Sequence, residues 1–379
     1  MERTKGILAK SELEEREISF TTIPFGPQHP ASGHVHVSLK CDGEEVVDLT
    51  FHPGYLHRGF ERLMEYRNHA QNSMLVDRIN VLDPFSCEMG YANVVEIAAG
   101  IEAPQRGKFI RTIMAELGRI QSHITWLGIM CMALGLDSGT RIAWGDREKI
   151  IRLNELATGG RIYPCYFIPG GVRRDLPQGF KEEALKALDY TENQVKLYDN
   201  LVFYNTTFVM RLENVGILRP DDAIAMGITG PNLRASGVVA DVRKDEPYDA
   251  YPYVNFKVVS LEKGDAYSRA LCRRGEIIES ISIIRQLLER IPEGDFRVKW
   301  GLTKKVAKGE AYFCCEAARG EFCYHMVSDG SERPYRVKVR APSFSQNLAA
   351  FPYLAKGAYI ADIPAIYWSL DSCPADMDR

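Results

Sequence analysis

The sequence contains no pair of cysteines with C-x-x-C spacing and no apolar run long enough to cross a membrane. Its nine cysteines are scattered and odd in number, which predicts neither a disulfide framework nor a self-contained zinc or iron–sulfur site. The most apolar run, ITWLGIMCMALGL, has thirteen residues, whereas a membrane helix needs about 20. The charged N-terminus lacks the apolar stretch of a signal peptide, so a reducing, intracellular compartment is expected.

The sequence also lacks an excess of basic residues. Its 47 Lys and Arg residues against 50 Asp and Glu residues give a net charge of −3, so no nucleic-acid partner is expected. Hydrophobic residues make up 45% of the 379 residues and charged residues 26%, which is typical of a globular protein with a large core.

Apolar periodicity predicts helices in the middle of the chain and strands near both ends. Residues 18–50 and 297–340 alternate between apolar and polar, which is the pattern of strands, and the DG pair at Asp42–Gly43 predicts a turn within the first stretch. The helical pattern dominates residues 59–290, and its clearest helix runs from Arg106 to about Leu134. We therefore predict an α+β fold with a central bundle of long helices and β-rich N- and C-terminal portions.

The pattern predicts a single large unit over residues 1–379. Its parts are a β-rich N-terminal part (18–58), a helical core (59–296), a β-rich part (297–345) and a C-terminal tail (346–379).

Histidines and arginines gather in two stretches of the N-terminal quarter of the chain. The stretch FGPQHPASGHVH contains His29 and His34, and a Pro/Gly loop that enters a strand explains it equally well. The following helical stretch contains Arg58 and Arg78. Because Arg78 lies between the apolar residues Leu75–Val76 and Ile79–Val81–Leu82, its charge needs a partner or a function.

Two further clusters are ambiguous when each is taken alone. Arg119 and His123 lie four apart on one side of the apolar helix, which is more often the setting of a satisfied core histidine than of a ligand. Cys373 and Asp376 lie three apart in the C-terminal SLDSCPADMDR, a spacing that proteins use to hold metals.

The clusters together form a longer pattern. FGPQHP, GYLHRGFE, ELGRIQSH, GGVRRDLPQGF, MVSDGSERPYRVKVRAPSF and the ending LDxxxxxxDR occur in this order. The sequence resembles the 49-kDa (D-type) catalytic subunit of the respiratory complex I family from Phe25 to Arg379. Members of this group include the large subunits of membrane-bound [NiFe] hydrogenases, of the methanogen deazaflavin-dependent dehydrogenase and of the archaeal membrane-bound sulfane sulfur reductase. The archaeal complex I-like members resemble it most.

This resemblance implies an [NiFe]-hydrogenase large-subunit-like fold and an oxidoreductase subunit for electron transport. The implied partners are a small subunit that holds a [4Fe–4S] cluster, a 30-kDa-type subunit and the membrane subunits of a proton- or sodium-pumping arm. No cofactor is expected on this chain alone, although the wider family is associated with NAD binding and quinone binding. The implied location is peripheral, at the cytoplasmic face of the cell membrane, with the C-terminal tail returning to the active-site cavity.

Hydrogenase relatives hold nickel and iron with four thiolates from two C-x-x-C pairs. By resemblance, Asn80 and Asp83 occupy the positions of the first pair, and Cys373 and Asp376 those of the second. Carboxylate and amide oxygens are hard ligands and do not replace bridging thiolates. The resemblance therefore implies no metal centre and no hydrogenase activity, and a cavity that serves another acceptor.

The acceptor is expected to differ from that of quinone-reducing relatives. Those relatives have a tyrosine at the position of Val81, a histidine that hydrogen-bonds the terminal cluster at that of Tyr163, and a loop histidine one place before His34. These differences favour sulfane sulfur or polysulfide over a quinone. Quinone or methanophenazine reduction is the alternative, and a non-catalytic scaffold is a third interpretation.

Cys87 follows Asp83 by four residues. It is either a buried small hydrophobe or a thiol that faces Cys373, in which case both thiols exchange with a polysulfide chain. The expected catalytic residues are Cys373, Asp376, Asp83, Cys87, His29, His34 and Arg78. Those expected beside the partner's cluster are Arg58 and Tyr163.

Overall fold

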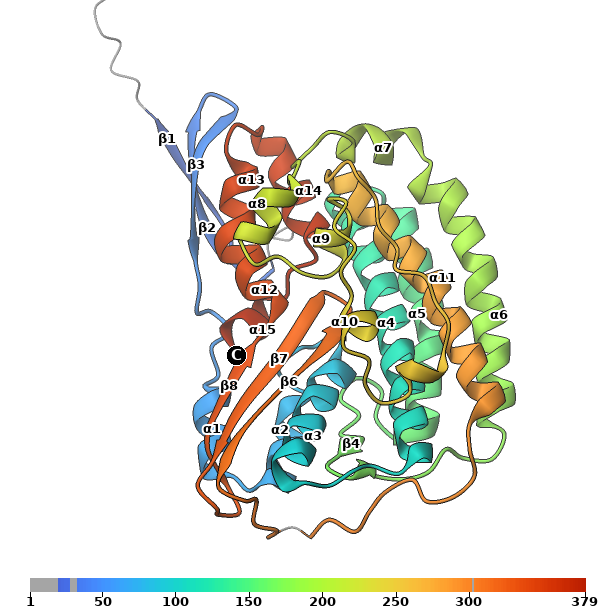
Figure 1. Ribbon diagram of the computed structural model, residues 1–379. Coiled ribbons are helices and arrows are strands. Elements are labelled where there is room, and N and C mark those ends of the chain that lie inside the picture. The colour runs from blue at the N-terminus through green and yellow to red at the C-terminus, as the bar shows by residue number, and fades with distance from the viewer. Residues whose placement is uncertain (1–19, 28–32, 302) are drawn as a thin grey trace, which may run out of the picture.

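The computed structural model describes residues 20–27, 33–301 and 303–379 and has the predicted α+β fold (Figure 1). Long helices form one side of the molecule, and two small antiparallel sheets, one from each β-rich portion, lie on the other side. Within the described residues, no helix is long and apolar enough to cross a bilayer.

Four long helices form the bundle: α4 (Gln105–Ala133), α5 (Asp137–Thr158), α6 (Phe180–Tyr198) and α11 (Ala266–Arg290). α4 packs between α5 and α11, and α6 packs against both of these neighbours. Most of α4 is buried because its isoleucines and leucines repeat at steps of three and four residues. The predicted limits of this helix, Arg106 and Leu134, are each one residue away from the observed limits.

Three shorter helices precede the bundle: α1 (Phe60–Tyr66), α2 (His69–Val76) and α3 (Pro84–Ala99). α2 begins with a capping box, in which the side chain of Asn68 and that of Gln71 each accept the other's backbone N–H. α3 begins with Asp83 as its N-cap and Pro84 in its first turn, both of which favour helix initiation.

The N-terminal sheet has the order β1 (Thr21–Phe25), β2 (His36–Asp42) and β3 (Glu45–His52). The predicted turn at Asp42–Gly43 is confirmed, since it joins β2 to β3 and Gly43 has a φ of +60°.

The second sheet has the order β6 (Gly309–Ala317), β7 (Gly320–Ser328) and β8 (Pro334–Arg340). α3 packs against β6 and β7, and α1 packs against β8. Two strands of two residues each, β4 (Phe167–Ile168) and β5 (Gly171–Val172), form a hairpin beside α3 and α4.

Short helices connect these parts and carry the C-terminal tail. They are α7 (Thr206–Leu212), α8 (Pro220–Ala225), α9 (Pro231–Arg234), α10 (Val242–Asp245), α12 (Pro342–Ser345), α13 (Phe351–Ala355), α14 (Ile363–Ser369) and α15 (Pro374–Asp378). α13 and α14 share a second hydrophobic cluster with the N-terminal sheet, which places the tail between that sheet and the bundle.

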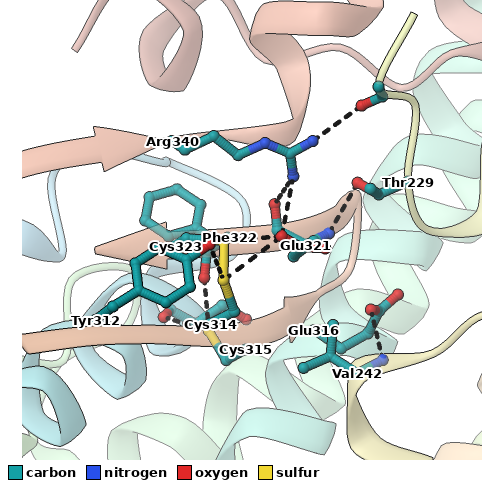
Figure 2. The surroundings of a disulfide bond; sticks show 12 residues. Thr229, Val242, Tyr312, Cys314, Cys315, Glu316, Glu321, Phe322, Cys323 and Arg340 are labelled. Carbon is teal, nitrogen blue, oxygen red and sulfur yellow. Dashed lines mark hydrogen bonds and ion pairs between the residues drawn. A yellow bond between two sulfur atoms is a disulfide. The ribbon is translucent and has the colours of Figure 1, made fainter. Parts of the chain in front are cut away.

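A disulfide joins Cys314 of β6 to Cys323 of β7, which was not expected from the sequence (Figure 2). The two cysteines are directly opposite each other in the strand register. An odd cysteine count and the lack of C-x-x-C pairs do not exclude such a cross-strand pair, because the pairing depends on register rather than on sequence spacing.

Candidate functional site

A cavity of about 180 Å³ lies where the N-terminal loop, the segment before α3 and the C-terminal tail meet. Its lining includes three of the positions singled out in the sequence, His34, Val81 and Cys373. It also includes Arg319 and Asp371, which the sequence motifs did not single out. His29 lies outside the described residues, so its place relative to the cavity stays a prediction.

The C-terminal tail is fixed to the loop that follows β3. Both carboxylate oxygens of Asp378 accept a backbone N–H at 2.9 Å, one from Gly54 and one from Leu56. His57 Nδ1 lies 2.7 Å from the Asp378 carbonyl oxygen, and Arg379 Nε donates to Glu61 at 3.0 Å. The last two residues of the chain therefore serve to dock the tail that carries Cys373.

Replacing Asp378 by alanine is expected to release this tail. The two hydrogen bonds to Asp378 each contribute about 1.5–3 kcal/mol, so loss of the carboxylate favours the undocked tail by roughly 100-fold or more. Carboxypeptidase digestion of the purified complex should therefore remove tail residues correspondingly faster. Asp362→Ala is the matched control, because Asp362 only forms a 3.7 Å ion pair with Arg211; equal digestion of both variants would contradict the docking role.

Asp376 and Asn80, which are far apart in the sequence, meet behind the cavity. Asn80 Nδ2 donates to Asp376 Oδ2 at 2.7 Å, while Asn80 Oδ1 accepts the backbone N–H groups of Leu82 and Asp83. Asp376 is fully buried, and this burial raises its pKa to about 7, against the opposing effects of Arg319 and of hydrogen bonds. The carboxyl group therefore exchanges a proton near neutral pH.

Asp83 has a structural role in this arrangement. Its Oδ2 accepts the hydroxyl of Ser86 at 2.7 Å and the backbone N–H of Ala318 at 2.8 Å. Its Oδ1 accepts the backbone N–H of Ser86, which caps α3. Asp83 thus joins α3 to the β6–β7 turn and is not among the residues that line the cavity.

Cys87 lies one helical turn after Asp83, inside the main hydrophobic cluster. Its Sγ is 3.7 Å from the Asp83 carbonyl oxygen, and burial raises the pKa of the thiol far above its usual range. It is not among the residues that line the cavity. The structure thus places Cys87 in the core and does not bring it to the cavity wall.

These positions do not fit a nickel–iron centre. Cys373 is the one thiol among the four ligand positions, Asn80 and Asp376 bond to each other, and Asp83 is occupied by structural hydrogen bonds. Bridging of the two metals requires soft thiolates, which three of these positions do not supply.

Metal analysis of the intact complex is accordingly expected to find no stoichiometric nickel. The measurement is elemental analysis by mass spectrometry, normalised to the large subunit. One nickel per large subunit would show that this interpretation of the cavity is wrong.

Arg319 is the cation of the cavity. Its Nε donates to the Asp371 carbonyl oxygen at 2.7 Å, its Nη2 to Asp371 Oδ1 at 3.1 Å, and its Nη1 to Ser122 Oγ at 3.3 Å. The pKa of Cys373 is raised to about 11 by burial and by Asp376, and Arg319 acts in the opposite direction. The sequence feature that could have drawn attention to Arg319 is a lone arginine in a two-residue turn between apolar strands.

Arg78, which the sequence placed among the expected catalytic residues, pairs with its neighbour Asp77. Its guanidinium bonds to Asp77 at 2.5 Å, lies over the Tyr163 ring at 5.3 Å, and remains 46% exposed. Arg78 is not among the cavity-lining residues, and the cation that acts on the thiol is Arg319. The partner that the sequence required for this arginine is therefore Asp77.

Arg58 and Tyr163 lie on the same side of the molecule as Arg78. Arg58 donates to the carbonyl oxygens of Arg78 at 2.7 Å and of Ala375 at 2.9 Å, so it joins the segment before α3 to the tail. Their position beside a cluster of the partner subunit stays a prediction.

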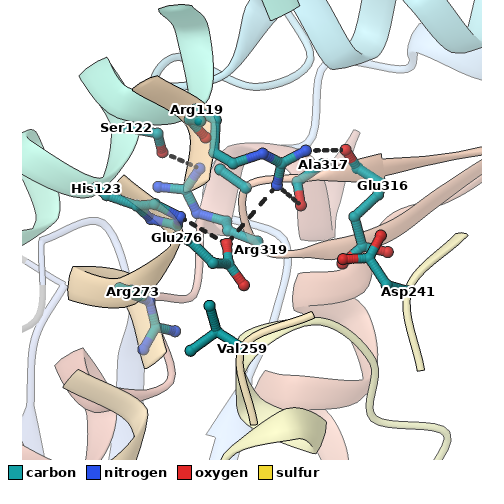
Figure 3. A network of polar contacts seen from close by, with 12 residues as sticks. Arg119, Ser122, His123, Asp241, Val259, Arg273, Glu276, Glu316, Ala317 and Arg319 are labelled. Carbon is teal, nitrogen blue, oxygen red and sulfur yellow. Dashed lines mark hydrogen bonds and ion pairs between the residues drawn. The ribbon is translucent and has the colours of Figure 1, made fainter. Parts of the chain in front are cut away.

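A network of buried charges supports Arg319 from behind (Figure 3). Arg119 donates to the Glu316 carbonyl oxygen at 2.6 Å, at the end of the strand that leads into the Arg319 turn. His123 Nε2 lies 2.9 Å from Glu276, which shows that this pair belongs to the internal network. The charges in this network are paired, because an unpaired buried charge is strongly unfavourable. The network thereby stabilises the turn that carries Arg319.

Comparison with known proteins shows the family. Residues 133–306 and 298–379 match the family described as "Respiratory-chain NADH dehydrogenase, 49 Kd subunit". The chain is 39% identical over 399 residues to a D-type subunit of the NADH-quinone oxidoreductase of Rhizobium meliloti (strain 1021), covering 98% of each chain. It is 39% identical over 374 residues to the D-type subunit of the F(420)H(2) dehydrogenase of Methanosarcina mazei, covering 97% of this chain and 99% of the relative.

A solved structure is similar over nearly the whole chain. It is a chain of the membrane-bound sulfane sulfur reductase (MBS), an archaeal respiratory membrane complex, with a TM-score of 0.92 and 40% identity. The match covers 95% of this chain and 98% of that chain. The protein therefore belongs to the respiratory-chain NADH dehydrogenase 49 Kd subunit family and is an oxidoreductase subunit of the complex I type.

Proposed function

We propose that this chain is the acceptor-reducing catalytic subunit of a membrane-bound, ion-pumping respiratory complex, and that its acceptor is sulfane sulfur or polysulfide. In this proposal it sits at the cytoplasmic face of the membrane with a small [4Fe–4S] subunit, a 30-kDa-type subunit and membrane subunits. The observation that carries the proposal is a cavity thiol, Cys373, that shares its small cavity with the arginine Arg319.

The residues present suit a short anionic sulfur chain. A polysulfide dianion is stabilised by the Arg319 guanidinium. The thiolate form of Cys373, a minor form near neutral pH because the pKa is about 11, attacks its terminal sulfur to form a persulfide, leaving a dianion shorter by one sulfur. Two electrons from the partner's cluster and one proton then release hydrosulfide and restore the thiolate. Asp376, three residues after Cys373 and with a pKa of about 7, supplies that proton.

The size of the cavity also favours a small acceptor. The cavity in this chain has a volume of about 180 Å³, whereas pockets for drug-sized ligands occupy about 300–1,000 Å³. Val81 lines it with an apolar side chain at the position where quinone-reducing relatives have a tyrosine hydroxyl. A quinone headgroup would lack that hydrogen-bond donor.

Quinone or methanophenazine reduction is the second candidate, because relatives 39% identical to this chain are named NADH-quinone oxidoreductase. His34, which lines the cavity, is one side chain that could donate to such a headgroup. A non-catalytic scaffold is disfavoured, since decay would not maintain a cavity lined by a thiol and a paired arginine.

The test is an assay of the purified intact complex with reduced ferredoxin, NADH or reduced deazaflavin as donor. Polysulfide, a quinone and methanophenazine are compared as acceptors. Hydrosulfide release well above quinone reduction supports the proposal, fast quinone reduction with no polysulfide activity supports the second candidate, and no reduction of any acceptor supports the scaffold.

A further inference from the structure

Cys314, Cys323 and Glu321 gather metal-binding atoms on one face of the β6–β7 hairpin, apart from the cavity (Figure 2). Cys314 and Cys323 are directly opposite in the register, with Cα atoms 4.1 Å apart. Glu321 precedes Cys323 by two residues and so lies on the same face of β7. One ligand atom from each of the three residues lies within 4.8 Å of the other two.

The carboxylate lies against both sulfur atoms. Glu321 Oε1 is 3.0 Å from Cys323 Sγ and 3.5 Å from Cys314 Sγ. In the disulfide neither sulfur carries a proton, so this oxygen faces sulfur lone pairs with no donor between them. Reduction of the disulfide supplies what is missing between the oxygen and the sulfurs. Two thiol protons, or one cation in their place, then interact with both sulfur atoms and the carboxylate.

The position of Glu321 is fixed by its backbone. Its N–H donates to Thr229 Oγ1 at 3.0 Å, and its carbonyl oxygen accepts Arg340 Nη1 at 2.9 Å. Arg340 Nη2 also donates to the Gly227 carbonyl oxygen at 2.9 Å, which leaves its guanidinium 3.7 Å from the Glu321 carboxylate. The carboxylate is therefore held beside the sulfurs and is not covered by a close ion pair.

We propose that the reduced hairpin binds a thiophilic divalent cation such as Zn²⁺ through Cys314 Sγ, Cys323 Sγ and Glu321 Oε1, with water as the fourth ligand. Two thiolates, a carboxylate and tetrahedral geometry are a donor set that zinc accepts, whereas Mg²⁺ and Ca²⁺ require oxygen ligands alone. The charges also balance, because two thiolates and Glu321 carry −3, and the cation and Arg340 carry +3.

The redox step is a two-electron reduction by thiols. Two molecules of a low-molecular-weight thiol become one disulfide as the Cys314–Cys323 bond breaks, and their two protons pass to the cysteines. Metal binding then releases these two protons. The bound cation joins the two strands beside the turn that carries Arg319, as the disulfide does in the oxidised state.

The first test measures metal content in the intact complex. After reduction with a phosphine, incubation with Zn²⁺ and removal of free metal, the wild-type complex should contain about one more zinc per large subunit than the Cys314→Ser/Cys323→Ser variant. Glu321→Gln should weaken zinc binding by about tenfold or more. Glu310→Gln is the matched control, since Glu310 pairs with His325 on the same hairpin.

The second test uses the wild-type chain, so that it does not depend on a variant that folds. Zn²⁺ should slow the alkylation of Cys314 at least tenfold and leave Cys165, another partly exposed cysteine, unaffected. Equal zinc content in wild type and the double serine variant would overturn the proposal. So would unchanged alkylation of Cys314, or a disulfide that phosphine does not reduce in the folded complex.

Discussion

Replacement of Cys373 by serine is expected to lower polysulfide reduction by about a hundredfold or more, the scale of losing a group that takes part in the chemistry. Serine keeps the size and the backbone of the tail, including the N–H of residue 373 that donates to Ser343 Oγ at 3.0 Å. It removes the thiolate that attacks sulfur in the proposed mechanism. Initial rates of hydrosulfide release, measured with a saturating electron donor, give the effect.

The matched control is Cys87→Ser. Cys87 is 1% exposed and does not line the cavity, so this change should leave the rate of the folded complex within a few fold of the parent. The paramagnetic resonance signal of the [4Fe–4S] cluster proposed for the partner subunit should persist in both variants. A Cys373→Ser complex with full polysulfide activity would show that no cavity thiol takes part. A parent complex that reduces quinones and ignores polysulfide would instead refute the proposed acceptor.

The predictable part of the fold is the local part. The period of α4 and the Gly43 turn between β2 and β3 depend on a few neighbouring residues, and both lie within one or two positions of their predicted places. The strand register was not predictable in the same way. A register shift of one residue would place Cys315 opposite Cys323 in place of Cys314. The paired cysteine would then come from the other face of the sheet, since Cys315 Sγ contacts the Ser86 carbonyl oxygen beneath the sheet.

The candidate site, like the fold, is predictable only where it depends on neighbouring residues. The tail motif identifies Cys373 and Asp376, but the 2.7 Å bond between Asp376 and Asn80 joins residues 296 positions apart. Nearness in the motif suggests that Arg78 acts on the thiol, yet its long side chain extends toward Asp77 and Tyr163. Arg319 reaches the cavity because the β6–β7 turn packs against the tail, and no local pattern in the sequence indicates that packing.

Asp376→Asn is expected to lower polysulfide reduction by about a hundredfold, within the range for loss of a general acid, and to change its pH dependence. Burial raises the pKa of Asp376 from 3.8 to about 7, so the protonated, donating form predominates below pH 7. The parent rate should therefore fall as the pH rises through about 7. The asparagine variant is near in shape but carries no titratable proton, so its residual rate should show no such step.

The same shift predicts a change in stability that does not depend on catalysis. A carboxyl group whose pKa is higher in the folded than in the unfolded chain binds more protons when folded, so stability falls as the pH rises between about 3.8 and 7 and is level above 7. Asp376→Asn should remove that part of the pH dependence of the thermal midpoint, and Asp83→Asn is the comparison, since Asp83 is committed to Ser86 and Ala318. If the asparagine variant keeps the parent's fall in rate above pH 7, the proton for the leaving hydrosulfide comes from another group. If it also keeps the parent's stability profile, Asp376 is ionised in the folded protein, and the buried carboxyl is a structural partner of Asn80 rather than an acid.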